Sequence, residues 1–374
     1  MKNLSQNKRH KTDKLREQTI NTVQALLPIW CDNIVNNIPY IKRYGSLSKL
    51  LCRSYPKCWK LDKLKEYFFA SEEYDVRFIE KECGLSKEII LQIGQLFLMD
   101  TSTLSGTSSC DGCKDEILIK KPVLIIGGGP SLDTYNHLEL LKKYGFNGDI
   151  FCVSSILKKV LEYGIIPNYV VSIDAENHDT MFLEHEIIKE HSDKITGIFS
   201  VTVHPSTNEC FKGNRYFIQG YINPETAPNV GHMIYLFTNV LSIVTCGNVG
   251  SSCITLASSM GYNPIITIGL DLSFPTEKEL KHYYDSIIHT WDKRKKEIDW
   301  NLPEYKYKHM INPDFNKEYY IDKTFESYAI STKEIIYHLS SVNKLIINCT
   351  EQGALHSKHI KAMKFIDYLE NQCL

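Results

Sequence analysis

The chain has 374 residues, of which 43% are hydrophobic and 23% are charged, which is the composition of an ordinary globular protein. Its formal net charge of −1 at pH 7 gives no global electrostatic attraction to nucleic acid or to an anionic membrane. No apolar run approaches the roughly 20 residues of a membrane-spanning helix, and the N-terminal residues lack the apolar segment of a signal peptide. We therefore expect a cytoplasmic protein that neither spans a membrane nor binds nucleic acid.

The 12 cysteines are scattered along the chain rather than grouped. Cys152, Cys246 and Cys349 lie inside apolar runs, as reduced and buried thiols do. Cys110 and Cys113 form a single CxxC motif, without the second pair at matching spacing that a structural zinc site needs. The cysteines therefore predict no resident metal.

Three regions can be separated by sequence pattern. Residues 1–105 carry apolar positions at helical spacing and are expected to form a helical region. Residues 106–119 are rich in small polar residues without periodicity, and they form the predicted linker. Residues 120–374 form the predicted nucleotide-binding domain.

In this domain, short apolar runs alternate with amphipathic segments. The predicted strands are 122–126, 150–153, 169–173, 195–203, 216–218, 265–268 and 344–347, and the predicted helices are 137–144, 156–163, 181–191, 251–260 and 333–339. This alternation predicts an α/β fold, with a doubly wound, mostly parallel, Rossmann-like sheet covered by helices on both faces. Ligands bind beyond the carboxyl ends of the strands in such sheets, so polar residues that follow strands are candidate site residues.

The first candidate is the turn Gly127-Gly-Gly-Pro-Ser-Leu132, which follows the first predicted strand. Glycines let the backbone approach a phosphate, and the start of the next helix offers free N–H groups to an anion. The spacing is neither a dinucleotide-binding GxGxxG motif nor a P-loop. The turn predicts phosphate binding, and the alternative is a tight turn without a ligand. The residues assigned to nucleotide binding here are Gly127, Gly128, Gly129, Pro130, Ser131 and Leu132.

The second candidate is the end of the strand at 169–173, where Asp174 is followed by Asn177 and further polar residues. Asp174 could bind a sugar hydroxyl, hold Mg²⁺ or act as a base, and Asn177 could contact the substrate. The alternative is that Asp174 or Asn177 caps a helix.

A second Gly- and Ser-rich turn precedes the predicted helix at 251–260. Its side chains could donate to ligand oxygens, so that two helix N-termini would enclose one nucleotide; ordinary helix capping is an equally good interpretation. The residues assigned to nucleotide binding in this turn are Asn248, Gly250, Ser251 and Ser252.

Two further strand ends present polar side chains. Asp271 is a candidate catalytic residue and Ser273 a candidate substrate contact, and Thr350 and Glu351 are candidate substrate contacts after the last predicted strand. His178, His204 and His232 lie near these turns, and His204 is a candidate for proton transfer, although a structural histidine is the more common case for each.

Four segments in order carry a family resemblance: Gly127–Asp133, Val171–Asp174, Asn263–Phe274 and Asn348–Ala354. Together they resemble the motility-associated factor family of flagellin glycosyltransferases, which transfer nonulosonic acids from CMP-sugars. That family shares its core domain with the 6-hydroxymethylpterin diphosphokinases. One departure from the transferase pattern is Gln352, which stands where a glycine is usual.

The resemblance implies a transferase and leaves two activities open. In a glycosyltransferase the two Gly-rich turns would hold the nucleotide of a nucleotide-sugar, and Asp174, Asp271 or His204 would take a proton from a protein or glycan acceptor. In a diphosphokinase the same turns would hold ATP, and Asp174 and Asp271 would hold Mg²⁺, the only cofactor that either activity implies. A third hypothesis is a nucleotide-binding module without catalysis.

Overall fold

The structure is a computed structural model that describes residues 26–47, 121–222, 242–274 and 308–372, with single residues between 231 and 240. The predicted linker and the CxxC motif lie outside the described residues, so the boundary predicted at 106–119 stays a prediction. The chain divides into two compact units. The smaller contains Met1–Leu118, Ser200–Thr202 and Tyr216–Ile243, and the larger contains Ile119–Phe199, Val203–Arg215 and Val244–Leu374.

The larger unit is built on a parallel sheet whose strands follow the order β11-β10-β7-β1-β2-β3-β4. These strands are β1 (Val123–Ile126), β2 (Asp149–Val153), β3 (Tyr169–Ser172), β4 (Thr196–Ser200), β7 (Ile265–Ile268), β10 (Ile346–Asn348) and β11 (Lys361–Ala362). Every residue of β1, β2 and β7 is buried, because both faces of the sheet are covered, and this explains why these strands are mostly apolar. The predicted α/β class with a mostly parallel sheet is confirmed.

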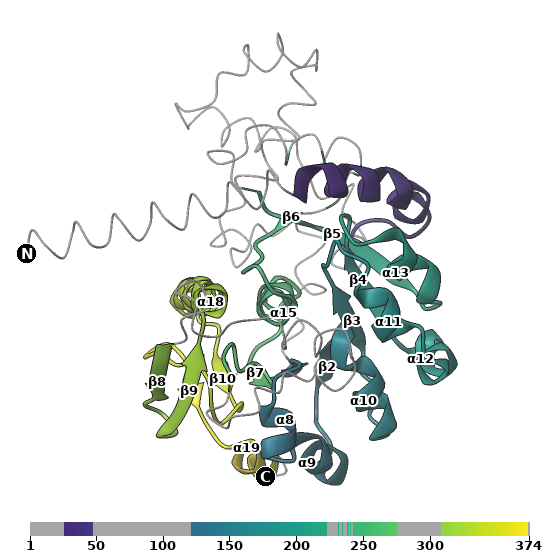
Figure 1. The fold of residues 1–374 in the computed structure, drawn as a ribbon. Helices are drawn as coiled ribbons and strands as arrows, with labels where there is room; N and C mark the ends of the chain where they lie inside the picture. Colours follow the sequence, from purple (N-terminus) through teal and green to yellow (C-terminus); the bar gives the residue numbers. More distant parts are fainter. Residues whose placement is uncertain are drawn as a thin grey trace, which may run out of the picture. The chain divides into compact units, whose positions relative to one another are not determined.

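Helices cover both faces of this sheet (Figure 1). One side of β2 to β4 carries α10 to α13, and the other carries α15 and α18, which pack on each other. The helices on the first side, with the short 3-10 segment η1, are α8 (Ser131–Thr134), α9 (His137–Tyr144), η1 (Ser154–Ile156), α10 (Leu157–Glu162), α11 (Asp179–Leu183), α12 (Glu186–His191), α13 (Pro205–Cys210) and α19 (Phe365–Asn371), which packs on α9. Those on the second side are α15 (Val249–Ser259) and α18 (Lys323–Ser341).

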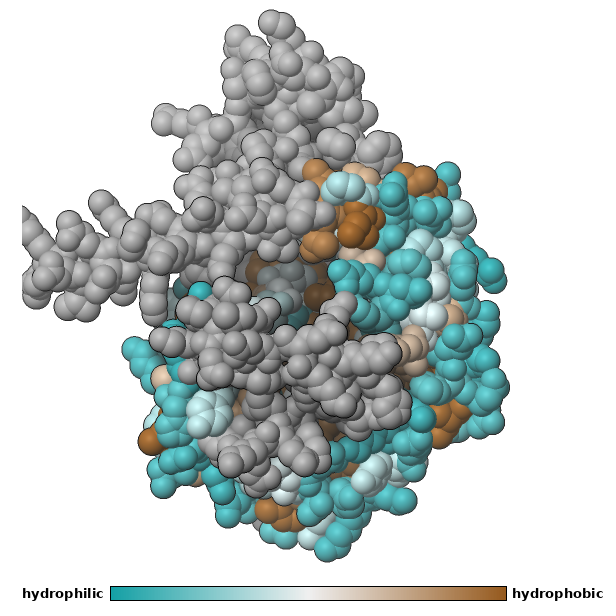
Figure 2. Space-filling view, in the orientation of Figure 1, coloured by the Kyte–Doolittle hydropathy of each residue, from teal (hydrophilic) through white to brown (hydrophobic). Residues whose placement is uncertain are grey.

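The outer surface of α10 to α12 is mostly hydrophilic, as expected for helices that bury one face only (Figure 2). Helix α15 is different, because eight of its eleven residues are buried, including Ser251, Ser252 and Cys253. It contacts β1, β2, β3 and β7, so it forms the centre of the packing on its face. Among the described residues, no helix is both long and apolar enough to cross a membrane.

An antiparallel hairpin of β8 (Lys308–Asn312) and β9 (Lys317–Ile321) was not predicted. Its residues mix Lys, Glu and Tyr without a clean alternation of polar and apolar positions, so the sequence gives no period-2 signal. The hairpin is tied to the end of β7, because Phe274 and Tyr320 exchange two backbone hydrogen bonds. It therefore belongs to the carboxyl side of that strand.

The smaller unit contains a helix over residues 26–44 and the parallel pair β5 (Arg215–Gly220) and β6 (Ser242–Ile243). Two buried asparagines on the helix, Asn33 and Asn37, donate side-chain hydrogen bonds of 2.9 and 3.1 Å to the carbonyls of Thr202 and Val201. These bonds satisfy backbone groups beyond the end of β4. The predicted N-terminal helical region is confirmed for these residues.

Candidate functional site

The turn after β1 packs against the turn after β7. Gly127 N–H donates to the carbonyl of Ile268 at 2.9 Å, and Gly129 N–H donates to the carbonyl of Gly269 at 2.8 Å. A Cβ atom on Gly129 would overlap Asp271 Oδ2 and lie 2.7 Å from the Gly269 carbonyl oxygen. A Cβ atom on Gly127 would lie 2.4 Å from the same carbonyl oxygen, so the protein's own chain requires both Gly127 and Gly129. A Cβ on Gly128 would meet only Ser155 Oγ, at 3.3 Å.

Asp271 lies at the centre of this contact and is 2% exposed. Its Oδ2 accepts a 2.7 Å hydrogen bond from Ser131 Oγ, and its Oδ1 accepts one of 2.6 Å from Gln352 Nε2. Burial raises the pKa of this carboxyl group, while the bonds from Ser131 and Gln352 and the nearby His137 oppose that rise. Gln352, the departure from the family pattern, thus orients the carboxylate.

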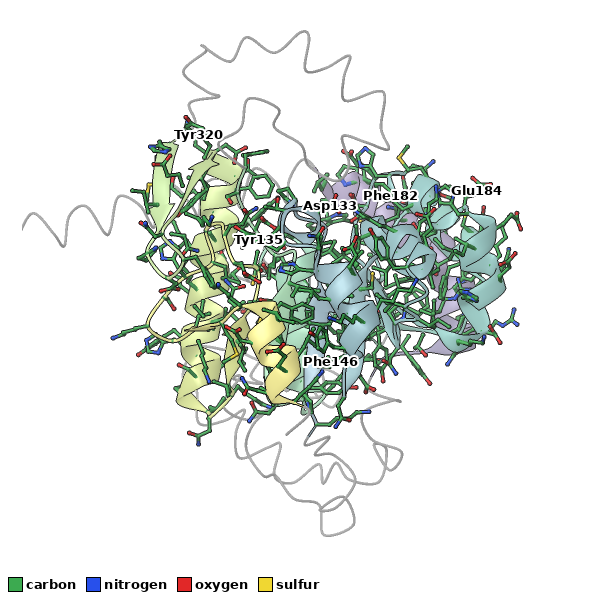
Figure 3. All side chains as sticks on the ribbon, turned by 90° about the horizontal axis from the view of Figure 1, so that it is seen from below. Asp133, Tyr135, Phe146, Phe182, Glu184 and Tyr320 are labelled. Atoms are coloured by element: carbon green, nitrogen blue, oxygen red, sulfur yellow. The ribbon has the colours of Figure 1, made fainter. Side chains whose placement is uncertain are left out.

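The loop after β10 completes the same cluster. Tyr135 OH donates to Gln352 Oε1 at 3.3 Å, and Figure 3 shows Tyr135 between α8 and the C-terminal elements. Glu351 accepts a 2.9 Å hydrogen bond from Phe365 N–H and lies 3.4 Å from Nε2 of the buried His137. Sequence reasoning missed Tyr135 and His137 because their only signal is helical spacing, which any core residue shares.

The other predicted residues at this edge also bond within the protein. Thr350 Oγ1 accepts from Leu270 N–H at 3.3 Å, and Ser273 Oγ donates to the carbonyl of Asp271 at 3.1 Å. Ser273 and Thr350 are both buried. The structure therefore brings together the ends of β1, β7 and β10 in one network. The polar side chains of this network form hydrogen bonds mainly with other groups of the protein.

The second Gly- and Ser-rich turn starts α15 with a side-chain cap. Asn248 Oδ1 accepts from Ser251 N–H at 2.9 Å, and Asn248 Nδ2 donates to Ser251 Oγ at 2.9 Å. Ser252 Oγ donates to the carbonyl of Asn248 at 2.7 Å, and Ser251 Oγ lies 2.7 Å from Thr332 Oγ1 on α18. The structure supports the capping interpretation of Asn248, and Gly250, Ser251 and Ser252 are buried beneath it.

A third group of polar side chains lies at the ends of β3 and β4 and is partly exposed. Asp174 is 44% exposed, its Oδ1 accepts a 3.0 Å hydrogen bond from Glu176 N–H, and its Oδ2 is 3.5 Å from His178 Nδ1. Asn177 and His204 both contact Ser206, at 2.8 Å and 2.6 Å. The structure therefore brings three predicted residues, Asp174, Asn177 and His204, to neighbouring turns, and it adds Ser206 and Thr180.

A buried carboxylate lies directly beneath this group. Asp179 is 3% exposed and accepts hydrogen bonds from Ser154 Oγ, at 2.6 Å, and from Ser172 Oγ. Burial raises the pKa of Asp179 to about 6, and the two serine bonds oppose that rise. Asp179 links the ends of β2 and β3 from the start of α11; the sequence showed it only as one of several polar residues after a strand.

The chemistry available at this sheet edge differs between the two clusters. Both carboxyl oxygens of Asp271 accept hydrogen bonds from within the protein, so this group has a structural role. Asp174 and His204 are partly accessible and can exchange protons with a bound molecule. No group of three or more His, Cys, Asp or Glu side chains suited to a metal ion exists among the described residues.

Residues 99–277 match the family model described as 6-hydroxymethylpterin diphosphokinase MptE-like. This region is similar to the MptE-like family. The MptE-like match spans β1 to β7 and includes both Gly-rich turns, Asp174, His204 and Asp271, while Thr350 and Glu351 lie beyond it. The family resemblance expected from the ordered motifs is confirmed.

A solved structure similar to this chain is that of the MAf glycosyltransferase from Magnetospirillum magneticum AMB-1. The two chains share 15% sequence identity with a TM-score of 0.49, and the similarity covers 69% of this chain. This chain spans only 37% of the length of that protein. No curated protein sequence matches the chain.

Proposed function

We propose that this protein is a glycosyltransferase that moves a sugar from a nucleotide-sugar to a hydroxyl group of a protein or glycan. The donor class that the family resemblance implies is a CMP-activated nonulosonic acid. The observation that carries the proposal is that a partly exposed carboxylate (Asp174) and an imidazole (His204) lie on neighbouring turns, joined by a backbone hydrogen bond from His204 N–H to the Asp174 carbonyl, and that no described residue engages His204 Nε2. Glycosyl transfer needs such a base for the acceptor hydroxyl.

In the proposed reaction, the acceptor oxygen forms a bond to the anomeric carbon while the bond from that carbon to the phosphate oxygen breaks. CMP leaves with the bonding electron pair, and a base takes the acceptor's proton. Because both oxygens of Asp271 accept hydrogen bonds from Ser131 and Gln352, this carboxylate is poorly placed as the base. Asp174 and His204 remain as candidates for that role.

The second candidate function is diphosphate transfer from ATP to a pterin alcohol, and the family model's own description supports it. This reaction calls for Mg²⁺ on the two carboxylates Asp174 and Asp271. The donor set fits poorly, because both oxygens of Asp271 already accept hydrogen bonds and no group of three or more His, Cys, Asp or Glu side chains among the described residues is suited to a metal ion. For this reason we rank the diphosphokinase second.

Ligand-induced thermal stabilisation of the full chain separates these functions. A ligand that binds only the native state raises the free energy of unfolding by about 2.7 kcal/mol when its concentration is 100 times Kd, and the melting temperature rises with it. We expect a shift with CMP and CDP that does not need Mg²⁺. A shift with ATP and Mg²⁺ alone would overturn the glycosyltransferase proposal in favour of the diphosphokinase.

A second experiment measures CMP release from a CMP-nonulosonic acid by wild-type protein and by the variants Asp174→Asn and His204→Gln. At least one variant should lose turnover by 100-fold or more, as removal of a general base does (roughly 10²–10⁴-fold). Asp133→Asn is the matched control, because Asp133 is exposed and pairs only with Lys159 at the surface. A non-catalytic module would bind CMP, release none from the donor, and show no effect of either variant beyond affinity.

A further inference from the structure

His204 belongs to a compact set of four side chains at the ends of β3 and β4. Ser206 Oγ is at the centre, 2.6 Å from His204 Nδ1, 2.5 Å from Thr180 Oγ1 and 2.8 Å from Asn177 Oδ1. Thr180 Oγ1 also contacts Asn177 Oδ1 directly. These are four short contacts between oxygen or nitrogen atoms, and each is a hydrogen bond only if one of its two atoms carries a proton.

Counting the available protons favours one tautomer of His204. The hydroxyl groups of Ser206 and Thr180 supply one proton each, and the carbonyl oxygen of Asn177 supplies none. If His204 Nδ1 carried no proton, only two of the four contacts could be hydrogen bonds. If Nδ1 is protonated, Ser206 Oγ accepts from Nδ1–H, while the hydroxyl groups of Ser206 and Thr180 both donate to Asn177 Oδ1, so that three of the four contacts are hydrogen bonds.

One contact argues in the opposite direction and is weaker. The backbone N–H of Ser206 points toward His204 Nδ1 at 3.4 Å, which would suit an unprotonated Nδ1. This distance exceeds the roughly 2.7–3.2 Å of normal N–H···acceptor bonds, whereas the side-chain contact at 2.6 Å is short. The side-chain network therefore dominates.

We infer that Ser206 accepts a hydrogen bond from His204 Nδ1–H, so that His204 presents the lone pair of Nε2 as the base for the acceptor hydroxyl. Ser206, Asn177 and Thr180 are positioning residues that act through His204. This inference rests on the proposed glycosyltransferase function for the identity of the proton donor. In the reaction the acceptor's proton moves to Nε2 as the bond from the acceptor oxygen to the anomeric carbon forms, and the resulting imidazolium later releases that proton to solvent.

The location of Nε2 supports this role. No described residue forms a hydrogen bond with it, and the His204 side chain is only partly buried. The backbone of His204 is fixed as well, because its N–H donates to the carbonyl of Asp174 at 3.2 Å. Fixing the ring through Nδ1 leaves the other ring nitrogen free for chemistry, the usual division of roles in catalytic histidines.

The tautomer can be measured without any substrate. In full-length protein labelled with ¹⁵N-histidine, two-bond correlation spectra distinguish an Nδ1–H ring from an Nε2–H ring, and His204→Gln identifies the signals among the 13 histidines. We expect Nδ1–H in the wild type, a shift toward Nε2–H in Ser206→Ala, and retention of Nδ1–H in Ser206→Thr. An Nε2–H ring in the wild type, or an unchanged tautomer in Ser206→Ala, would overturn the inference.

Turnover supplies the second readout. In the CMP-release assay, Ser206→Ala should lower kcat about 10- to 100-fold with little change in KM, and Ser206→Thr should restore most of it. Ser341→Ala on α18, whose hydroxyl bonds only the carbonyl of His338, is the matched control. If the tautomer is Nδ1–H but no CMP-sugar is turned over, the proposed function fails while the hydrogen-bond assignment stands. If Ser206→Ala keeps full kcat, the positioning role fails.

Discussion

Ser131 donates a 2.7 Å hydrogen bond to the buried carboxylate of Asp271, and this bond joins the turn after β1 to the turn after β7. In an open parallel sheet, ligands commonly bind where the chain leaves two neighbouring strands toward opposite faces. β1 continues into α8 on one face, and β7 leads to the hairpin and α18 on the other. The side chain of Asp271 lies at this point, so the protein's own carboxylate occupies part of the position where a ligand anion commonly binds.

The first prediction concerns the stability that Asp271 provides. Asp271→Ala leaves the donors on Ser131 and Gln352 without their acceptor and opens a cavity, so it should lower the free energy of unfolding by about 2–4 kcal/mol. Asp133→Ala, at an exposed position of α8, should cost about 0–1 kcal/mol. Urea unfolding followed by circular dichroism measures both free energies. Equal losses in the two variants would show that the hydrogen bonds to Asp271 add no stability beyond that of an exposed ion pair.

The second prediction separates the glycines of the first turn. Gly129→Ala places a Cβ against Asp271 Oδ2 and the Gly269 carbonyl, so we expect a loss of about 3 kcal/mol or more, or failure to fold. Gly128→Ala meets only Ser155 Oγ, at 3.3 Å, so its stability should change by less than about 1 kcal/mol. If this turn binds phosphate, Gly128→Ala should still weaken nucleotide-induced thermal stabilisation. A stable Gly129→Ala variant would contradict this account.

The sequence predicted those features of the fold and of the candidate site that depend on local pattern. Alternating strands and helices predicted the sheet, and the strand ends named Asp174, Asn177 and His204, which the fold brings to neighbouring turns. The glycine turn was expected to serve a phosphate, but Gly127 and Gly129 are required by the neighbouring strand. A single sequence cannot distinguish these two reasons for glycine, because both demand the absence of a side chain.

Other features depended on long-range contacts that no local pattern contains. Gln352 looked like a departure from a family pattern, and only the fold shows that its amide reaches Asp271, 81 positions away in sequence. In the sequence Asp179 cannot be distinguished from the exposed polar residues beside it, yet its side chain is buried and accepts hydrogen bonds from Ser154 and Ser172. Burial of single polar residues follows from tertiary packing rather than from periodicity.

The third prediction is a pH dependence caused by Asp179. Its pKa in the folded protein is about 6, above the ordinary value of 3.8, so the folded state holds this proton over a range in which the unfolded state has lost it. The contribution of this group to stability should therefore fall as the pH rises from about 4 to about 6, by on the order of 3 kcal/mol in total, and then level off.

Asp179→Asn keeps a neutral polar side chain between the two serines and removes the titration. The difference between wild type and variant in urea midpoint, measured from about pH 4 to pH 7, should therefore grow in favour of the variant and then become constant. A parallel pair of curves would mean that Asp179 has the same pKa in both states. Asp133→Asn serves as the control, because Asp133 is exposed and its removal should leave the shape of the curve unchanged.

The fourth prediction tests whether Asn248 caps a helix or donates to a ligand. Asn248 Oδ1 accepts from Ser251 N–H, so Asn248→Ala should destabilise the protein by about 0.5–2 kcal/mol, while Asn248→Asp keeps an acceptor oxygen and should retain most of that stability. Nucleotide-induced thermal stabilisation then distinguishes the two roles.

If capping is the whole role of Asn248, the Asn248→Asp variant binds CMP as the wild type does. If the side-chain amide also donates to the nucleotide, Asn248→Asp folds normally and binds CMP at least 10-fold more weakly, because a carboxylate faces the phosphate. Since the amide already donates to Ser251 Oγ at 2.9 Å, we expect the first outcome.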